Sequence, residues 1–251
     1  MRNPSALNVR IAANVEAVRQ RIREATVRVG RSEADVTLIA VTKYASTTDG
    51  IVNALLAAGC GDLGESRPQA LQEKAEHFPP PPPPLLKGEG TIRWHLIGPL
   101  QRNKVRKILP SVSLIHSVDS IRLAEAIDRI ADDLSSETGQ PIRPRCLLEV
   151  AISDDDAKHG FEAEELPCVL DRLAVLRHVS FLGLMGMSGL DATGAEIRRQ
   201  FADLRCLAES LRERGTPENV SLTKLSMGMS DDFEIAVEEG ATLVRIGSLL
   251  Y

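Results

Sequence analysis

The sequence predicts an α/β protein built as a single (β/α)8 TIM barrel, with an extra N-terminal helix before the first strand. Eight short, apolar and often β-branched segments alternate with amphipathic segments of helical spacing, as in parallel strands joined by helical crossovers. Eight such units form a closed barrel, and 251 residues are a typical length for one. We therefore expect one domain over residues 1–251. A doubly wound open sheet is the alternative fold.

The opening helix is expected over residues 5–29, where apolar residues recur with helical spacing among arginines and glutamates. The first strand, residues 36–42, is apolar on both faces, as a buried parallel strand requires. The other strands are expected near 61–64, 92–97, 112–116, 145–151, 179–185, 221–225 and 242–246. The helices between them are expected near 47–58, 67–77, 101–109, 119–137, 162–177, 194–214 and 230–239.

Six consecutive prolines, residues 79–84, stand between the helix near 67–77 and the strand near 92–97. Proline has a fixed φ and no N–H group, so this tract is incompatible with a helix or a central strand. We expect a stiff, solvent-exposed polyproline II insertion in a loop. A ligand for an SH3-type domain is the alternative.

The composition is that of a soluble globular protein, with 43% hydrophobic and 26% charged residues and a formal net charge of −5. This acidic balance argues against non-specific binding to nucleic acid or to a membrane surface. The sequence has no secretory signal and no run of about 18 apolar residues, so we expect a cytoplasmic protein. The spacing of Cys60, Cys146, Cys168 and Cys206 matches no zinc or disulfide pattern, and we expect buried, reduced thiols.

Polar residues at the carboxyl ends of the strands are the candidates for function, because the active sites of such barrels lie there. Lys43 follows the first strand. We expect its amine to be partly desolvated, which lowers its pKa and lets it attack an aldehyde. A lysine that extends its charged end into solvent is the alternative.

Two neighbouring loops predict a phosphate site. Residues 226–231, Ser-Met-Gly-Met-Ser-Asp, supply hydroxyls and a glycine before a helix expected to open at Ser230, and Gly247 and Ser248 supply further amides. Ser230 as a plain N-cap, with Glu234 nearby, is the alternative.

Arg245 is expected to point into the barrel, because residues 243 and 245 share a strand face. A buried arginine needs a partner, which is either a ligand acceptor or a carboxylate such as Glu65. His95 is expected to be a hydrogen-bonded structural group, since the other histidines are not spaced as metal ligands. The aspartates 154–156 and the basic stretch 101–107 are expected to be solvated, with anion or RNA contact as the alternative for the basic stretch.

Several motifs together resemble one known family over about residues 8 to 250. They are Thr42-Lys43, Trp94-His-Leu-Ile-Gly98, Gln101-Arg-Asn-Lys104, His116-Ser-Val-Asp119, Leu225-Ser-Met-Gly-Met-Ser-Asp-Asp-Phe-Glu234 and Val244-Arg-Ile-Gly247. The sequence resembles the pyridoxal phosphate homeostasis protein family. This resemblance implies a fold type III barrel similar to the N-terminal domain of alanine racemase, with pyridoxal 5′-phosphate (PLP) as cofactor.

The resemblance also implies the roles of individual residues. Lys43 would form an internal aldimine with PLP, and Arg245 would face its pyridine nitrogen. The phosphate would be held by Ser226, Met229, Ser230, Gly247 and Ser248. Further cofactor contacts are expected from Ser66, His95 and Met185. Ser66 stands where the family usually has asparagine, which puts the contact to the ring hydroxyl in doubt, and residues 249–251 stand where the family has a short helix with another arginine.

The implied chemistry favours binding over catalysis. A permanently protonated guanidinium disfavours protonation of the ring nitrogen, so the ring becomes a weak electron sink. A racemase needs an acid and a base on opposite faces of its substrate, and related racemases take the second base from an added β domain of another subunit. We expect the barrel to occupy residues 1–251 and therefore expect no such domain among them. We therefore expect a monomeric, non-catalytic protein that holds PLP and hands it to apo PLP-dependent enzymes. The alternatives are a PLP-dependent amino-acid racemase and a phosphate-sugar enzyme that forms a Schiff base.

Overall fold

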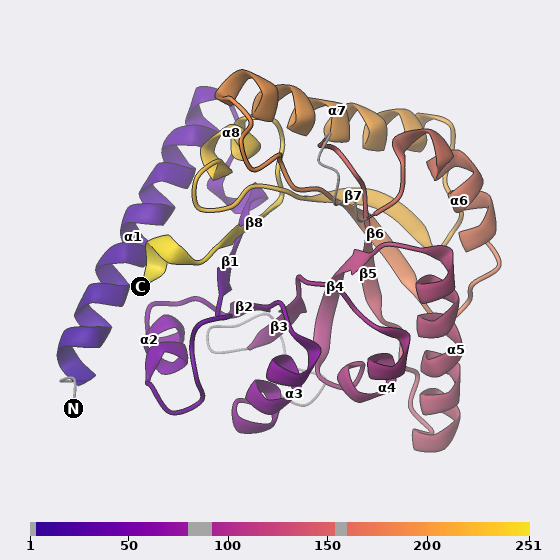
Figure 1. The fold of residues 1–251 in the computed structure, drawn as a ribbon, viewed down its shortest axis with the longest axis horizontal. Helices are drawn as coiled ribbons and strands as arrows, with labels where there is room; N and C mark the ends of the chain where they lie inside the picture. Colours follow the sequence, from indigo (N-terminus) through magenta and orange to yellow (C-terminus); the bar gives the residue numbers. More distant parts are fainter. Residues whose placement is uncertain (1–3, 80–91, 154–159) are drawn as a thin grey trace.

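Eight parallel strands close into a barrel in a computed structural model, which describes residues 4–79, 92–153 and 160–251 (Figure 1). Each strand pairs with the next along the chain, and β1 pairs with β8 to close the sheet. The strands are β1 (Thr37–Val41), β2 (Asp62–Glu65), β3 (Arg93–Leu96), β4 (Val112–Val118), β5 (Arg145–Glu149), β6 (Ser180–Met185), β7 (Val220–Ser226) and β8 (Leu243–Ile246). The predicted (β/α)8 barrel is confirmed, and the open sheet is excluded.

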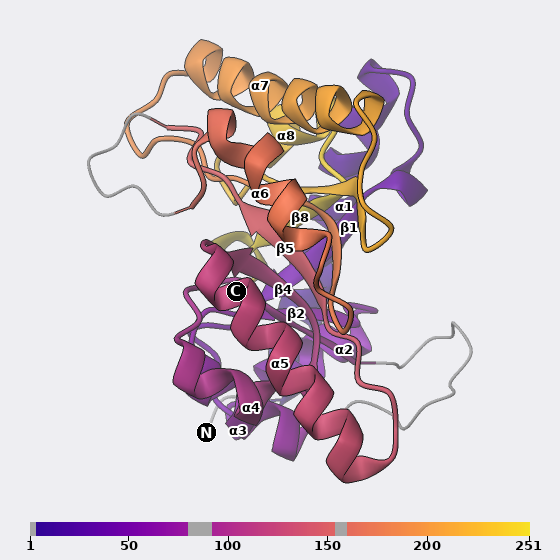
Figure 2. The same cartoon turned by 90° about the vertical axis from the view of Figure 1, so that its right-hand side faces the viewer.

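Helices cover the outside of the barrel, and α5, α6 and α7 lie outside strands β4 to β7 (Figure 2). The α-helices are α1 (Pro4–Arg28), α2 (Ile51–Ala57), α3 (Pro68–His77), α4 (Val105–Ile108), α5 (Ile121–Thr138), α6 (Leu166–Leu173), α7 (Gly194–Glu213) and α8 (Phe233–Glu238). Short 3-10 turns are η1 (Glu33–Asp35), η2 (Arg102–Lys104), η3 (Ala163–Glu165) and η4 (Ser248–Leu250).

Four α-helices, α2, α4, α6 and α8, begin three or four residues later than the sequence predicts, and the 3-10 turns η2 and η3 lead into α4 and α6. Residues 47–50 form a loop in which Asp49 accepts hydrogen bonds from the backbone N–H groups of Ser46 and Ile51, and α2 starts after Gly50, whose φ is +78°. Near the carboxyl end of β7, α8 begins at Phe233 and Asp232 precedes it. The expectations of a helix opening at Ser230, and of Ser230 as its N-cap, are therefore wrong.

The core has two parts, because the barrel strands are buried on both faces. The outer face packs against the helices and contains most of the buried apolar residues. A smaller cluster inside the barrel comprises Ile39, Leu114, Leu147, Met185 and Leu243. Leu243 lies in this inner cluster and Val244 in the outer one, so the predicted inward face of residues 243 and 245 is confirmed.

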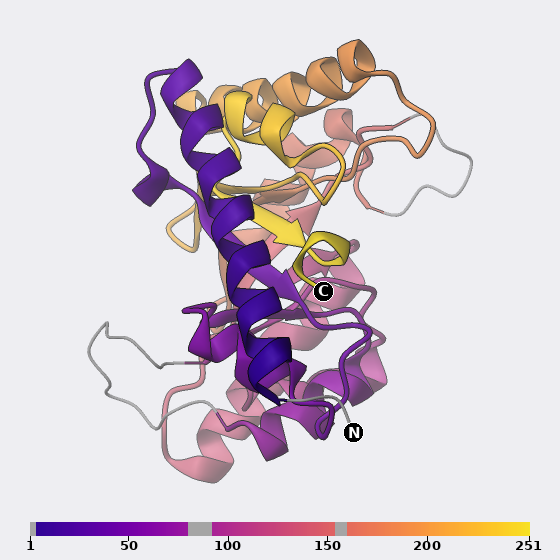
Figure 3. The same ribbon diagram turned by 90° about the vertical axis from the view of Figure 1, so that its left-hand side faces the viewer.

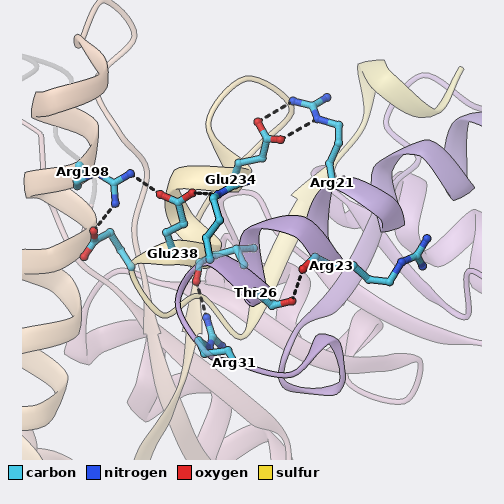
Figure 4. Close-up of polar contacts among 10 residues, drawn as sticks. Arg21, Arg23, Thr26, Arg31, Arg198, Glu234 and Glu238 are labelled. Atoms are coloured by element: carbon cyan, nitrogen blue, oxygen red, sulfur yellow. Dashed lines mark hydrogen bonds and ion pairs between the residues drawn. The ribbon is translucent and has the colours of Figure 1, made fainter.

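The N-terminal helix α1 lies along the outside of the barrel, beside α2, α8 and the C-terminal turn η4 (Figure 3). Figure 4 shows one contact between α1 and α8, in which Arg21 donates to both carboxylate oxygens of Glu234, each at 3.1 Å. Arg28 also pairs with Glu238, at 2.6 Å. Arg31 donates to the backbone oxygens of Val237 and Ala241 at the end of α8. The additional helix is thus attached to the helix that follows the predicted phosphate loop.

Two cysteines differ from the prediction. Cys60 and Cys146 are buried, and burial raises the pKa of the Cys60 thiol to about 11. Cys168 on α6 and Cys206 on α7 are exposed, because both face solvent from helices that bury their opposite sides. The expectation that all four thiols are buried is therefore wrong.

Some sequence predictions concern residues outside the described part of the chain. These are the proline tract from Pro80 onward, the aspartates 154–156 and His159. Among the described residues, no helix combines the length and apolar character needed to cross a membrane.

Candidate functional site

Lys43 directly follows β1 at the carboxyl end of the barrel. Thr42 is fully buried, while the Lys43 side chain is exposed and its Nζ lies 5.0 Å from the centre of the Tyr44 ring. The expected partial desolvation of Lys43 is therefore wrong, because Lys43 and Tyr44 form an exposed turn after the last buried position of the strand.

A buried ion pair supports the backbone next to Lys43. The Nζ atom of Lys74, on α3, lies 2.5 Å from Oε2 of Glu65 and donates to the backbone oxygen of Thr42 at 2.6 Å. The side chains of Lys74 and Glu65 are 5% and 0% exposed. Thr42 also donates from its hydroxyl to the backbone oxygen of Gly64 at 3.1 Å. Lys74 thus holds the peptide group that leads into Lys43, a role that no local pattern in the sequence indicates.

The loop after β7 is held in a tight turn beside the barrel mouth. Asp232 accepts from the backbone N–H of Met229 at 2.6 Å with one carboxylate oxygen and from the hydroxyl of Ser188 at 2.5 Å with the other. Gly228 has a φ of +91°, and a Cβ atom there would lie 2.5 Å from the Cβ of Ala236. Glycine is therefore required for α8 to pack against this loop.

The loops after β7 and β8 lie next to each other, as the sequence predicts. The backbone N–H of Gly247 donates to the hydroxyl of Ser230 at 3.4 Å, which joins the two loops. Ser226 and Ser230 are buried, Met229 and Gly247 are half-buried, and Ser248 is exposed. These five residues form the cradle, a name used below for the predicted phosphate site.

Arg245 lies inside the barrel and is only 4% exposed. Its Nη1 donates to the backbone oxygen of Ser226 at 2.8 Å and to its hydroxyl at 2.7 Å, and its Nη2 donates to the backbone oxygen of Gly186 at 3.1 Å. Burial lowers its pKa to about 10, although the negative charges of Asp232 and Glu149 act in the opposite direction. The guanidinium therefore remains charged at neutral pH.

The partners of Arg245 are neutral oxygens. Within the described ranges it forms no ion pair, and Glu65, the carboxylate proposed from the sequence, is paired with Lys74 instead. The alternative of an Arg245–Glu65 pair is therefore wrong, because Glu65 is directed toward Lys74 on α3. A buried cation with neutral partners favours a ligand that brings an acceptor or negative charge to the barrel mouth.

His95 is hydrogen-bonded through both ring nitrogens, as the structural interpretation predicts. Its Nε2 lies 3.0 Å from Oδ1 of Asp62, and its Nδ1 lies 3.0 Å from Nε2 of His116. His116 Nδ1 in turn lies 2.8 Å from the hydroxyl of Ser226. His95 therefore reaches the cradle only through His116, a connection that residue spacing alone does not reveal.

The two remaining predicted cofactor contacts, Ser66 and Met185, lie in different parts of the barrel. Ser66 follows β2 and is half-buried, and its backbone N–H donates to Glu65 Oε1 at 2.9 Å. Gly98 packs against Ser66 so closely that a Cβ on Gly98 would lie 2.3 Å from the backbone oxygen of Ser66. Met185, at the carboxyl end of β6, is 1% exposed and belongs to the inner cluster. Met185 is thus part of the barrel interior, and Ser66 lies on the rim near Lys43.

Comparison with known proteins identifies the family. The chain matches the family described as alanine racemase, N-terminal domain, over residues 10–251. A pyridoxal phosphate homeostasis protein of Pseudomonas aeruginosa is 37% identical over 242 residues, which are 96% of this chain and 94% of the relative. The corresponding protein of Deinococcus radiodurans is 38% identical, with 95% and 99% covered. The chain belongs to the pyridoxal phosphate homeostasis protein family.

Solved structures of similar proteins agree with this family assignment. The structure of PipY from Synechococcus elongatus with PLP bound is 33% identical to this homeostasis-family chain, with a TM-score of 0.77 and coverage of 96% and 99% of the two chains. An alanine racemase of Clostridium difficile has a TM-score of 0.68 but is only 16% identical. It covers 96% of this chain, which covers 55% of the racemase, so that likeness shows a shared fold.

Proposed function

We propose that this chain binds PLP at the carboxyl end of the barrel and acts in PLP homeostasis, with little or no catalytic turnover. Its relatives are named for that function, and one of them, PipY, has been solved with PLP bound. We assign the aldehyde to Lys43, the pyridine nitrogen to Arg245 and the phosphate to the cradle. Within the cradle the Ser226 hydroxyl is already bonded to Arg245 and His116, which leaves Met229, Ser230, Gly247 and Ser248 to donate to the phosphate.

The buried guanidinium of Arg245 is the observation that carries this proposal. Its three hydrogen bonds to described residues use three of the five N–H donors of an arginine, which leaves two for a ligand. The lone pair of a pyridine nitrogen is a suitable acceptor, and the anionic phosphate of PLP adds the negative charge that the neutral partners of Arg245 do not provide. The residues present therefore fit this cofactor.

Lys43 supplies the amine. Lys43 would hold PLP through its amine, and the cofactor would supply the aldehyde that joins a primary amine as an imine with release of water. The exposed Lys43 side chain gives its Nζ room to enter the mouth, and the Lys74 contact to Thr42 holds its backbone.

The site chemistry supports holding the cofactor over turning over a substrate. Arg245 remains protonated at neutral pH and only donates, so it keeps the ring nitrogen from accepting a proton. An unprotonated ring withdraws electrons weakly and gives little stabilisation to a carbanion. We propose that the protein shields the reactive aldehyde and delivers PLP to apo PLP-dependent enzymes in the cytoplasm.

Borohydride reduction tests the assignment of Lys43. Reduction of the PLP-loaded protein should fix the cofactor on the peptide that contains Lys43, as read by mass spectrometry. Lys43→Ala should lose this adduct and the visible absorbance of the imine, whereas Lys107→Ala, at another exposed lysine, should keep both. An adduct on a different lysine in the wild type would overturn the assignment.

Two further measurements separate the alternatives. Appreciable racemisation of alanine during long incubation would favour a racemase, and an imine formed only with an added sugar phosphate would favour a phosphate-sugar enzyme. Transfer of bound PLP to an apo-enzyme tests delivery. Transfer no faster than spontaneous release would contradict the delivery role.

A further inference from the structure

A continuous chain of hydrogen-bonded side chains crosses the inside of the barrel and ends at Arg245. Its five members come from five strands: Asp62 on β2, His95 on β3, His116 on β4, Ser226 on β7 and Arg245 on β8. The successive contacts measure 3.0, 3.0, 2.8 and 2.7 Å. Every member is at most 8% exposed, so the contacts are removed from solvent. We call these five residues the interior chain.

The donors and acceptors of the interior chain can be arranged in one direction. Arg245 has only donors, so the Ser226 hydroxyl oxygen accepts from it. The hydroxyl proton of Ser226 then has His116 Nδ1 as its acceptor at 2.8 Å.

The protonated ring nitrogen of each histidine follows from these contacts. Neutral His116 with an accepting Nδ1 carries its proton on Nε2 and donates it to His95 Nδ1. Because His95 Nδ1 accepts from His116, the ring proton of His95 lies on Nε2, which donates to the carboxylate of Asp62. In this arrangement the Ser226 hydroxyl, His116 Nε2 and His95 Nε2 each donate to an acceptor within the interior chain.

The charges at the two ends agree with this direction. Asp62 also accepts from Nε of Arg93 at 2.6 Å, and the hydrogen bonds from Arg93 and His95 outweigh burial and lower its pKa to about 2. Burial, together with the nearby His95 and Arg245, lowers the pKa of His116 well below its usual range, so His116 is neutral. Among the described residues, the titratable or charged groups in and around the interior chain are Cys60, Asp62, Arg93, His95, His116, Glu149, Asp232 and Arg245.

We propose that Asp62, His95 and His116 are positioning residues for the cofactor, which act by fixing the Ser226 hydroxyl as an acceptor for Arg245. This inference rests on the proposed PLP site. The ionised Asp62 sets the direction of the chain from the opposite end of the barrel interior. Arg245 is thereby held in one orientation, with its remaining N–H donors available to the ring nitrogen.

Reversing the chain would have a specific consequence. If His95 donated from Nδ1 to His116, then His116 would donate from its own Nδ1 to Ser226. The Ser226 oxygen would then receive two donors, from His116 and Arg245, and its own proton would have no acceptor within the interior chain. An unsatisfied buried hydroxyl is costly, so the direction toward Asp62 is favoured.

A pair of His116 variants tests the proposal in the PLP-loaded protein. His116→Leu removes both chain contacts, whereas His116→Gln retains one acceptor and one donor. We expect the Leu variant to bind PLP about tenfold more weakly, and the pH titration of its visible absorbance band to shift. The Gln variant should recover most of the affinity and the wild-type titration. His178→Gln, at a partly exposed histidine beside Asp132, is the control and should change neither.

A folded His116→Leu variant with wild-type affinity and an unchanged pH titration would overturn the proposal. If that variant does not fold, the direction of the hydrogen bonds can still be measured in the ligand-free wild-type protein. Long-range proton–nitrogen NMR spectra of histidine-labelled protein should show His95 and His116 each protonated on Nε2, with slowly exchanging ring protons. A proton on Nδ1 of either ring would refute the chain direction. This spectrum is recorded without PLP, so it tests the direction of the interior chain independently of PLP binding. Failure of the wild-type protein to bind PLP would count against the proposed function only.

Discussion

Lys74 and Glu65 form a buried ion pair, with 2.5 Å between Nζ and Oε2, beside the peptide group that precedes Lys43. The pair joins α3 to the carboxyl end of β2, and the contact of Lys74 with Thr42 joins both to β1. The amine proposed to bind PLP therefore extends from a backbone that three elements hold in place.

Removing one partner of this pair should be strongly destabilising. In Lys74→Met the Glu65 carboxylate is left buried without its cation, and a single unpaired buried charge costs about 3–5 kcal/mol. We expect the free energy of unfolding, measured by urea denaturation, to fall by about that amount.

A double variant separates the charge from the packing. Lys74→Met with Glu65→Leu removes both charges, so it should be markedly more stable than Lys74→Met alone. Arg172→Met is the surface control, because Arg172 and its partner Glu125 are 61% and 49% exposed, and we expect a loss of at most about 1 kcal/mol. A Lys74→Met variant as stable as this control would contradict the argument.

Arg21 should restrain the cradle loop from the N-terminal helix. Its guanidinium lies 4.6 Å from the centre of the Phe233 ring and also pairs with Glu234, directly after the loop. Because the pair is partly exposed, Arg21→Ala should cost only about 1 kcal/mol of stability. We expect faster hydrogen exchange at the amides of residues 229–233.

Arg23→Ala is the matched control for this measurement. Arg23 lies on the same helix with a similar exposure, and its ion pairs are with Glu16 and Glu33, away from α8. It should leave exchange in residues 229–233 unchanged. Equal exchange in both variants would show that α1 does not restrain the loop.

The fold was predictable from sequence because its signals are local. Apolar β-branched runs and amphipathic spacing identified all eight strands and the opening helix, since burial on both faces leaves a pattern within each segment. The start of α8 was missed because Asp232, two residues beyond Ser230, supplies the contacts that shape the turn.

The site was only partly predictable, because its contacts link distant segments. Active sites of (β/α)8 barrels lie at the carboxyl ends of the strands, and this rule correctly predicted that the loops at Ser230 and Gly247 are neighbours. The sequence suggested Glu65 as a partner for Arg245, and the observed partner Ser226 could not be predicted because it depends on which way each side chain points across the barrel. The His95–His116 contact has the same origin, as it requires the register between two neighbouring strands.

Gly228 provides a sharp test of the cradle geometry. Gly228→Ala places a Cβ 2.5 Å from Ala236 and 2.9 Å from the Cα of Phe233, in addition to the strain of a positive φ. Gly215→Ala is the control, because its φ of +90° is nearly the same while no atom lies within 4 Å of the added Cβ. The control isolates the backbone strain, about 1–3 kcal/mol.

We expect Gly228→Ala to lose more unfolding free energy than Gly215→Ala and to lose PLP affinity, while Gly215→Ala keeps its affinity. Thermal or urea unfolding and a PLP titration measure the two effects. Equal losses of stability in both variants would mean that α8 can move away from the loop without cost.

The low pKa of Asp62 predicts how stability depends on acid. Its pKa of about 2 in the folded protein lies below its ordinary value, so the unfolded chain binds the proton first as the pH falls. The stabilisation, about 2 kcal/mol, is therefore fully present above about pH 4 and is lost as the pH falls toward 2.

In Asp62→Asn this contribution is absent at every pH, although the amide oxygen still accepts from His95. The unfolding free energies of the two proteins should therefore differ at pH 6 and converge by pH 2. A constant difference over this range would mean that Asp62 titrates at its ordinary pKa and that its bonds to Arg93 and His95 do not favour the carboxylate.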